Sequence, residues 1–502
     1  MYSLKNKFNF ETIYWLGLFS LLIYLFQNHT LCMDDIYYSF QDDRIKLLKE
    51  YFYGSWVVPL NNLLFYYLPN KLSINLQEWA QVVGVIFQTS VLMLLFWYFS
   101  KCFCGFDVRK KLTLTSIAIM AFFFFMYLVK NIDFVIYSGF FRFIIPSLLF
   151  FIWGYYYHKY LNGEKIPFLW LISVVAASSS EVVGFIMVVT SFAMFAYFEE
   201  EKSKNLLSVF VFSFIGLAIL LCSFGFQRHL YLKSGIHTIS EFSVNIIPFL
   251  KVYLIKFLLK QGLFWLSIFG LIYLNRKYIK TCRVEIALSL ALVGSIMLFV
   301  LSLVLLGKTH YSGGYWIIHR DLYTIFYTVF LFIFIILSLN LIKNDGTEIF
   351  KKSFRILAVL FIPLFILSCI HLKSSISTMK YFYLLRDKMV LYYLSKDEDI
   401  ILPRALCPEF EFTVISHIKT DKKRFLNYYP LHRFFKDLPA EDNTEKFVKL
   451  LLNYYKQVYH YKSHKQNYYA DFIDGNTAMD YYFDHGGKLP DKEKFSDLEI
   501  KP

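Results

Sequence analysis

The sequence lacks the cysteine patterns that mark metal-binding and disulfide-rich proteins. Its seven cysteines are scattered, and Cys102 and Cys104 form a C-x-C beside a basic loop with no second pair. This spacing predicts no zinc or redox site. Cys407 is the only cysteine after residue 371, so we expect no disulfide framework in the C-terminal region.

Charged residues are rare within several long apolar stretches. Hydrophobic residues make up 57% of the chain and the mean hydropathy is +0.45, whereas soluble domains are about 45–50% apolar. Runs of about 17–25 apolar residues have the length that a bilayer core requires. The sequence therefore predicts an all-α polytopic membrane domain over 1–371. Its candidate spans are 10–28, 78–100, 112–129, 143–158, 167–198, 205–224, 248–274, 284–306, 320–342 and 353–371.

Residues 372–502 have a different composition, dense in charge and tyrosine and without a spanning segment. Their number is sufficient for a small soluble domain. We expect an α/β unit with a strand near 398–402 and helices near 376–395 and 442–457. The tyrosine-rich end past about 465 is expected to be loosely ordered and dispensable for folding of the membrane part.

The net charge of +14 raises the question of nucleic-acid binding. Most of the excess positive charge lies in short loops beside hydrophobic spans, where membrane topology explains it. We therefore predict a protein of the lipid bilayer that has no nucleic-acid partner.

Four basic segments predict which ends of the spans face the cytoplasm, because Lys and Arg concentrate on that side. The first span is expected to be a retained anchor, since Gln27-Asn28-His29 offers no small-residue cleavage site. A cytoplasmic N-terminus then makes 29–77 an extracytoplasmic loop. The basic segments are the N-terminus with Lys5 and Lys7, and the loops 101–111, 275–283 and 343–355.

The stretch 167–198 is too long for a single comfortable span at about 1.5 Å per residue. Its middle, 176–181, is small and polar and ends in the carboxylate of Glu181. If the stretch crossed once, the basic loop 275–283 would face outward, against the charge rule. A hairpin of two short helices restores the rule and gives about eleven passes. It also places Glu181 and the C-terminal domain on the outer side.

The first outer loop carries Asp34 and Asp35 directly after the first span. Two adjacent carboxylates repel each other, and such a pair is most useful when one accepts a proton and the other orients a partner, a cation or a metal. The alternatives are a solvated pair and an N-cap for a helix beginning at Ile36. The segment 50–69 that follows is apolar and aromatic but broken by glycine and proline, which suits helices lying in the membrane interface.

Further ionisable residues on the predicted outer side complete the candidate site. Arg142 lies where an outer loop re-enters the membrane, with snorkelling of its side chain as the alternative. Glu181 lies in an apolar stretch, where an ionisable group is a functional-site hypothesis; the alternative is that it only caps the turn. The loop 307–320 adds the candidate phosphate-binding residues Lys308, His310, His319 and Arg320.

These features resemble the GT-C class of membrane glycosyltransferases, which carry an acidic pair in the first outer loop. Four stretches carry the resemblance: 33–37 with the two aspartates, 137–142, 180–184, and Arg320 at the opening of a late helix. Two C-terminal segments, 399–403 and 421–429, fit the same group. The likeness spans most of the chain and is closest to bacterial polytopic proteins related to the glucosyltransferases that modify O-antigen.

The resemblance implies a bacterial inner-membrane enzyme that uses a polyprenyl-phosphate sugar as donor. The acceptor would be a cell-envelope glycan or lipid, such as lipopolysaccharide, on the outer face; consistently, no nucleotide-sugar motif is apparent. Asp34 would be the general base, Asp35 its partner or a ligand for Mg or Mn, and Glu181 a third acidic group. The residues that would hold the phosphate or the acceptor are Arg142, Lys308, His310, His319 and Arg320.

Three other classes of function remain open. One is a transporter or flippase of lipid-linked glycans, since interrupted helices and an intramembrane carboxylate also suit that class. Against it, the chain shows no internal repeat, and the candidate acids gather at the predicted outer surface. Another is a non-catalytic envelope assembly protein whose C-terminal domain binds a partner. The third is another enzyme that acts on lipid-linked glycans, such as a ligase. A phosphoethanolamine-type transferase is not favoured, because it needs a large soluble catalytic domain with several metal ligands, which the C-terminal region lacks.

Overall fold

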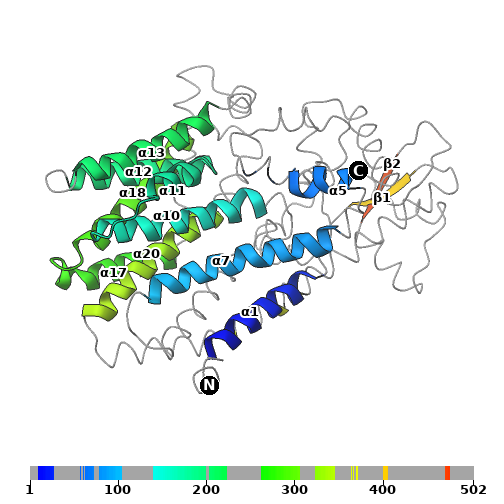
Figure 1. Ribbon diagram of the computed structural model, residues 1–502, viewed down its shortest axis with the longest axis horizontal. Coiled ribbons are helices and arrows are strands. Elements are labelled where there is room, and N and C mark those ends of the chain that lie inside the picture. The colour runs from blue at the N-terminus through cyan, green and yellow to red at the C-terminus, as the bar shows by residue number, and fades with distance from the viewer. Residues whose placement is uncertain are drawn as a thin grey trace, which may run out of the picture.

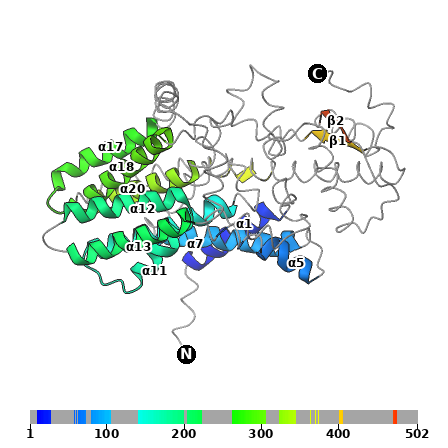
Figure 2. The same cartoon turned by 90° about the horizontal axis from the view of Figure 1, so that it is seen from above.

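The computed structural model describes residues 10–27, 57, 60, 63–72, 79–104, 140–198, 203–222, 262–305, 323–344, 363, 366, 369, 370, 373, 400–404 and 470–474. Most of them form a bundle of helices (Figures 1 and 2). The first part of the bundle comprises α1 (Phe10–Phe26), η1 (Leu63–Tyr67), α5 (Leu68–Lys71), η2 (Ala80–Gly84), α7 (Val85–Cys104), η4 (Phe140–Ile144) and α10 (Ile145–Leu161). The second part comprises α11 (Leu169–Ala177), α12 (Glu181–Tyr197), α13 (Ser203–Leu221), α17 (Gly262–Asn275), η6 (Arg276–Tyr278), α18 (Arg283–Leu305) and α20 (Tyr323–Asn344).

The helix bounds follow the predicted spans closely. The predicted spans 143–158, 284–306 and 320–342 correspond to α10, α18 and α20, each within a few residues. The predicted span 112–129, the first half of 248–274 and most of 353–371 lie outside the described residues. A mostly helical fold is therefore confirmed, whereas the predicted number of passes stays a prediction.

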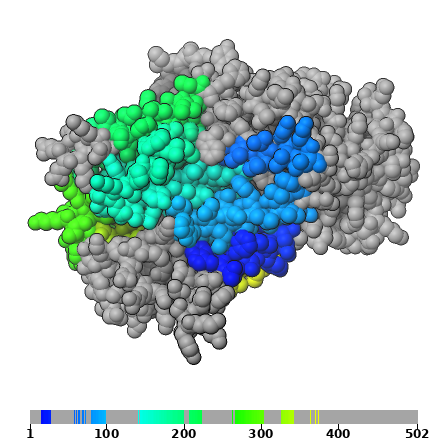
Figure 3. Space-filling view, in the orientation of Figure 1, coloured from blue at the N-terminus to red at the C-terminus, as the bar shows by residue number. Residues whose placement is uncertain are grey.

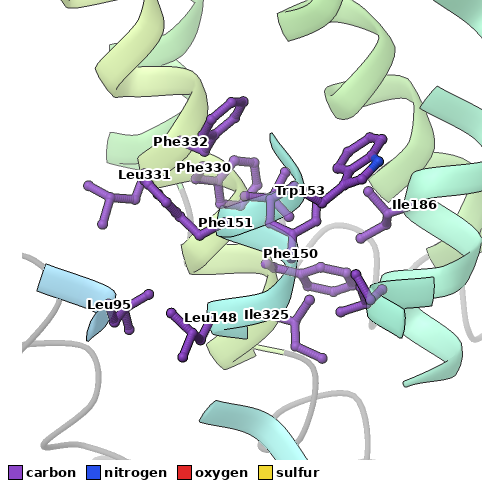
Figure 4. Close-up of a cluster of buried hydrophobic side chains, with 14 of the residues drawn as sticks. Leu95, Leu148, Phe150, Phe151, Trp153, Ile186, Ile325, Phe330, Leu331 and Phe332 are labelled. Carbon is purple, nitrogen blue, oxygen red and sulfur yellow. The ribbon is translucent and has the colours of Figure 1, made fainter. Parts of the chain in front are cut away.

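The centre of the bundle is an aromatic core between α10, α12 and α20 (Figure 4). Phe151 of α10 lies edge-on to Phe332 of α20, with ring centroids 5.4 Å apart. A Cβ at Gly154 would lie 3.0 Å from the Phe332 ring, so the glycine allows α10 and α20 to approach closely. These side chains are buried, so α10 and α20 are held together by many close contacts between large rings.

Several helices are apolar on their outer face as well. On α13, Leu207, Val211 and Phe214 are exposed, while Leu206 and Leu220 are buried. A helix that is apolar all round suits a membrane better than water. Within the described residues, two helical stretches, Ala80–Tyr98 and Arg283–Ser302, are long and apolar enough to cross a bilayer, and shorter apolar helices accompany them. Figure 3 shows α1, α7 and α10 side by side on one face of the molecule.

The predicted helical break within 167–198 is confirmed. The stretch forms α11 and α12, separated by Ser178–Ser180. Trp170 pairs with Phe212 of α13, and Val174 lies against Gly216, so α11 runs parallel to α13. On α12, Gly184 lies against Leu217 and Phe192 pairs with Phe210, so α12 runs antiparallel to α13. The two short helices are therefore antiparallel to each other and form a hairpin.

The bundle has two ends with different charge. The first, here called the basic end, lies at the left of Figure 1, where α7, α10, α12, α17 and α20 end and α1, α11, α13 and α18 begin. The second, here called the Glu181 end, holds the other terminus of each of these helices, including Phe26, Phe140, Glu181, Leu305 and Tyr323. The described cationic residues in the helix termini and connections of the basic end are Lys101, Lys159, Lys165, Lys204, Arg276, Lys277, Lys280, Arg283 and Lys343, and the described acidic residues there are Glu11, Glu164 and Glu285.

The C-terminal region contributes two strands. β1 (Ile400–Arg404) pairs in parallel with β2 (Ala470–Asp474), with Ile400 opposite Ala470. β1 matches the strand predicted near 398–402. β2 falls within the end past about 465, whose predicted loose order and dispensability stay predictions. The helices predicted near 376–395 and 442–457 and the boundary near 371 lie outside the described residues.

Candidate functional site

The turn between α11 and α12 is built from three serines that redirect the chain. The Ser178 and Ser179 hydroxyls donate hydrogen bonds to the carbonyls of Val174 and Ala176, at 2.8 and 2.6 Å. These bonds satisfy carbonyls that a helix end would leave unpaired. Ser180 is extended, with φ −159° and ψ 143°, and its carbonyl accepts the first bond of α12, from the Gly184 amide at 2.8 Å. The turn therefore presents the next side chain at a fixed position.

That next side chain is Glu181, the first residue of α12. It is partly buried, and the positive end of the helix dipole favours a negative charge at this position. Among the residues that the structure describes, no cation pairs with its carboxylate. A partly buried carboxylate that has no cation partner among the described residues is a candidate to meet a ligand or a substrate.

The base of the turn is rigid because two glycines bring three helices into close contact. A Cβ at Gly184 would lie 2.5 Å from the Ala177 carbonyl oxygen, and a Cβ at Gly216 would lie 2.6 Å from that of Val174. Small residues at such contacts let helix backbones approach closely in membrane proteins. The position of Glu181 is thus set by backbone packing.

Arg142 lies in η4, at the start of the chain's path into α10. Its neighbours Phe140 and Phe141 are fully buried. Phe141 stacks on Phe87 of α7 with ring centroids 5.0 Å apart, and Phe140 lies edge-on to the same ring at 6.4 Å. These contacts fix the backbone of Arg142 at the Glu181 end.

The structure thus brings two of the predicted site residues, Arg142 and Glu181, to one end of the bundle. The helix termini that flank Asp34 and Asp35, at Phe26 and Ala80, lie at this end, as do those that flank 306–322. The predicted residues that lie outside the described part of the chain are Asp34, Asp35, Lys308, His310, His319 and Arg320. The described residues contain no group of three or more His, Cys, Asp or Glu side chains that could hold a metal ion.

The basic end contains a polar cluster that the sequence did not predict. His158 Nε2 of α10 lies 3.0 Å from Glu285 Oε1 of α18. The Asn162 side-chain amide donates to the His158 carbonyl at 3.1 Å and lies 3.5 Å from the same Glu285 oxygen. The available signal was that His158 and Glu285 both fall near the predicted cytoplasmic ends of their spans. The pair ties α10 to α18, and we assign it to stability.

Comparisons with protein-family models, with curated proteins and with solved structures found no match for this chain.

Proposed function

We propose that this chain is a membrane glycosyltransferase of the GT-C type. It moves a sugar from a polyprenyl-phosphate donor to a cell-envelope glycan or lipid acceptor. The observation that carries the proposal is the placement of Arg142 and Glu181 at one end of the bundle. The connections that contain Asp34, Asp35, Lys308 and Arg320 also leave the bundle there.

The proposed orientation follows from charge. Because Lys and Arg favour the cytoplasmic side, the basic end faces the cytoplasm and the Glu181 end faces outward. The protein then crosses the bacterial plasma membrane about eleven times, with residues 372–502 outside. A lipid-linked donor on the outer leaflet meets the Glu181 end directly.

The proposed chemistry divides the charged groups into two sets. Asp34 accepts the proton of the acceptor hydroxyl, and Asp35 orients it or holds a divalent metal such as Mg or Mn, with Glu181 beside them. The leaving polyprenyl phosphate develops negative charge, which fixed cations stabilise. Those cations are Arg142, Lys308 and Arg320, and His310 and His319 contact the phosphate or the acceptor.

A transfer assay tests this function. Purified protein is given a panel of polyprenyl-phosphate sugars and envelope glycan acceptors, and product is followed by mass spectrometry. Asp34→Asn and Asp35→Asn should lower the rate by about 10²–10⁴-fold, the usual worth of a general base. The second acidic pair of the same loop, Asp42 and Asp43, provides the matched controls Asp42→Asn and Asp43→Asn, which should retain activity. Full activity in both Asp34→Asn and Asp35→Asn would end the base assignment.

A flippase is the second candidate, because α11 and α12 form an interrupted hairpin whose carboxylate, Glu181, has no cation partner among the described residues, and interrupted helices form the substrate sites of many transporters. The same purified protein in liposomes distinguishes the two functions. Movement of a fluorescent lipid-linked glycan between leaflets without any transfer product would favour the flippase.

A further inference from the structure

The connection between α17 and α18 gathers positive charge without local compensation. Arg276, Lys277, Lys280 and Arg283 are all exposed, and no acidic residue occurs between positions 262 and 284. Among the described residues, the first three have no carboxylate partner. Glu285, the nearest acid in sequence, is already held by His158. Since no described carboxylate neutralises Arg276, Lys277 or Lys280, these three cations can meet an anion from outside the chain.

The helix that leads to these cations has an apolar stripe on its exposed face. Leu266, Phe269 and Tyr273 are 72%, 52% and 57% exposed, and their spacing of three and four residues places them on one helix face. Gly270 lies on the same face, and a Cβ built there would meet nothing within 4 Å. The glycine thus leaves an open shallow dent in the stripe.

The stripe and the cations are continuous. The Arg276 guanidinium lies 3.6 Å from the centroid of the Tyr273 ring, a cation–π contact that holds the cation at the end of the stripe. The cations thus lie at one end of the apolar stripe. This arrangement is complementary to a molecule that has an anionic head and a hydrocarbon chain. Basic segments beside a membrane span attract anionic headgroups with about 1 kcal/mol per cation.

We propose that α17 and the turn after it bind an anionic phospholipid. The headgroup phosphate lies on Arg276, Lys277 and Lys280, and one acyl chain follows Leu266 to Tyr273 across the dent at Gly270. This site lies at the opposite end of the bundle from the proposed glycosyl transfer, so it does not depend on that function.

Native mass spectrometry of the purified chain in detergent tests the site with three probes. Phosphatidylglycerol should bind more tightly than phosphatidylcholine, and glycerophosphoglycerol, which has the headgroup without chains, should not bind. The triple variant Arg276→Gln, Lys277→Gln, Lys280→Gln should weaken phosphatidylglycerol binding by about 100-fold. Lys165→Gln, which removes an exposed cation from another connection of the basic end, should bind as the wild type does.

A second variant keeps the charges and changes the stripe. Gly270→Leu adds a side chain that projects from the stripe and holds the acyl chain away from the neighbouring apolar surface. It should weaken phosphatidylglycerol binding by about 5-fold, and thermal unfolding confirms that the variant folds. Equal binding of the two phospholipids, or an unaffected triple variant, would overturn the headgroup assignment. If glycerophosphoglycerol bound as tightly as phosphatidylglycerol, the site would be one for free phosphate. Wild-type affinity in Gly270→Leu would show that the acyl chain does not lie on the stripe.

Discussion

The two ends of the bundle differ in how their charges are used. At the basic end, polar side chains pair with one another: His158 with Glu285, and Lys159 with Glu164 at 2.8 Å. At the Glu181 end, the described carboxylate lacks such a partner among the described residues. Interactions within the protein stabilise a fold, whereas an unpaired ionisable group costs stability and is kept for another purpose.

The connections between helices are described to different extents at the two ends. The basic end joins neighbouring helices through the short segments 162–168, 199–202 and 276–282. At the Glu181 end, Ser178–Ser180 is a short connection as well, whereas the segments 223–261 and 306–322 lie outside the described residues. Functional residues are concentrated on loops that a rigid scaffold positions. Under the proposed function, the chemistry lies at the Glu181 end, and the basic end serves stability and membrane anchoring.

The largest expected effect is the all-or-none difference in accessibility between the ends. In a cysteine-free background, Lys71→Cys on α5 should react with a membrane-impermeant maleimide in intact spheroplasts. Lys277→Cys should react only after permeabilisation, because its end faces the cytoplasm. Both positions are exposed in the structure, so each should react once the membrane is open. Labelling of Lys277→Cys alone from outside would invert the assignment of the two ends.

The next effect is on transfer activity. Glu181→Gln should lower the rate by about 100-fold while changing the unfolding free energy by less than about 1 kcal/mol, because the helix dipole is the only favourable interaction of its charge among the described residues. Glu164→Gln, an exposed carboxylate of the basic end, is the matched control and should alter neither quantity, since exposed ion pairs contribute little. A Glu181→Gln protein that is fully active but less stable would make this residue a structural cap.

Packing beneath the turn gives a smaller effect, on stability. Gly184→Ala should destabilise the protein by about 1–3 kcal/mol, because its Cβ would lie 2.5 Å from the Ala177 carbonyl oxygen. Gly294→Ala in α18 is the control, since a Cβ there meets nothing within 4 Å and alanine favours a helix. The two melting temperatures in detergent should shift in opposite directions. If the two melting temperatures shifted equally, α11 and α12 would have moved apart to make room for the methyl group at position 184.

The smallest effect concerns the polar cluster of the basic end. Glu285→Gln and His158→Gln should each cost about 1 kcal/mol of unfolding free energy. The double variant should cost less than the sum of the two, with a coupling of at least about 0.5 kcal/mol. Transfer activity should stay unchanged in all three, which separates this cluster from Glu181. Simple additivity of the two costs would show that the pair contributes nothing as a pair.

The sequence predicted the elements that depend on local composition and segment length. Hydropathy located α10, α18 and α20, and length together with a polar break located the hairpin of α11 and α12. The His158–Glu285 pair was not predictable, because it depends on the register of two helices whose residues are 127 positions apart. The pairing of β1 with β2 has the same origin, since neither five-residue strand specifies its partner. The close contacts of Gly184 and Gly216 likewise emerge only from the packed helices.

The shortness of α11 has a consequence for the membrane itself. Nine residues give a helix about 13 Å long, less than half of a hydrocarbon core of about 30 Å. Around a chain that spans the bilayer, a helix of this length is accommodated by local thinning of the lipid or by snorkelling of flanking side chains. Headgroups and water would then be drawn inward beside Phe168 and Trp170, which are both exposed. Such a helix would deform the bilayer around the protein, and a long-chain lipid that reaches α11 would meet this deformed region.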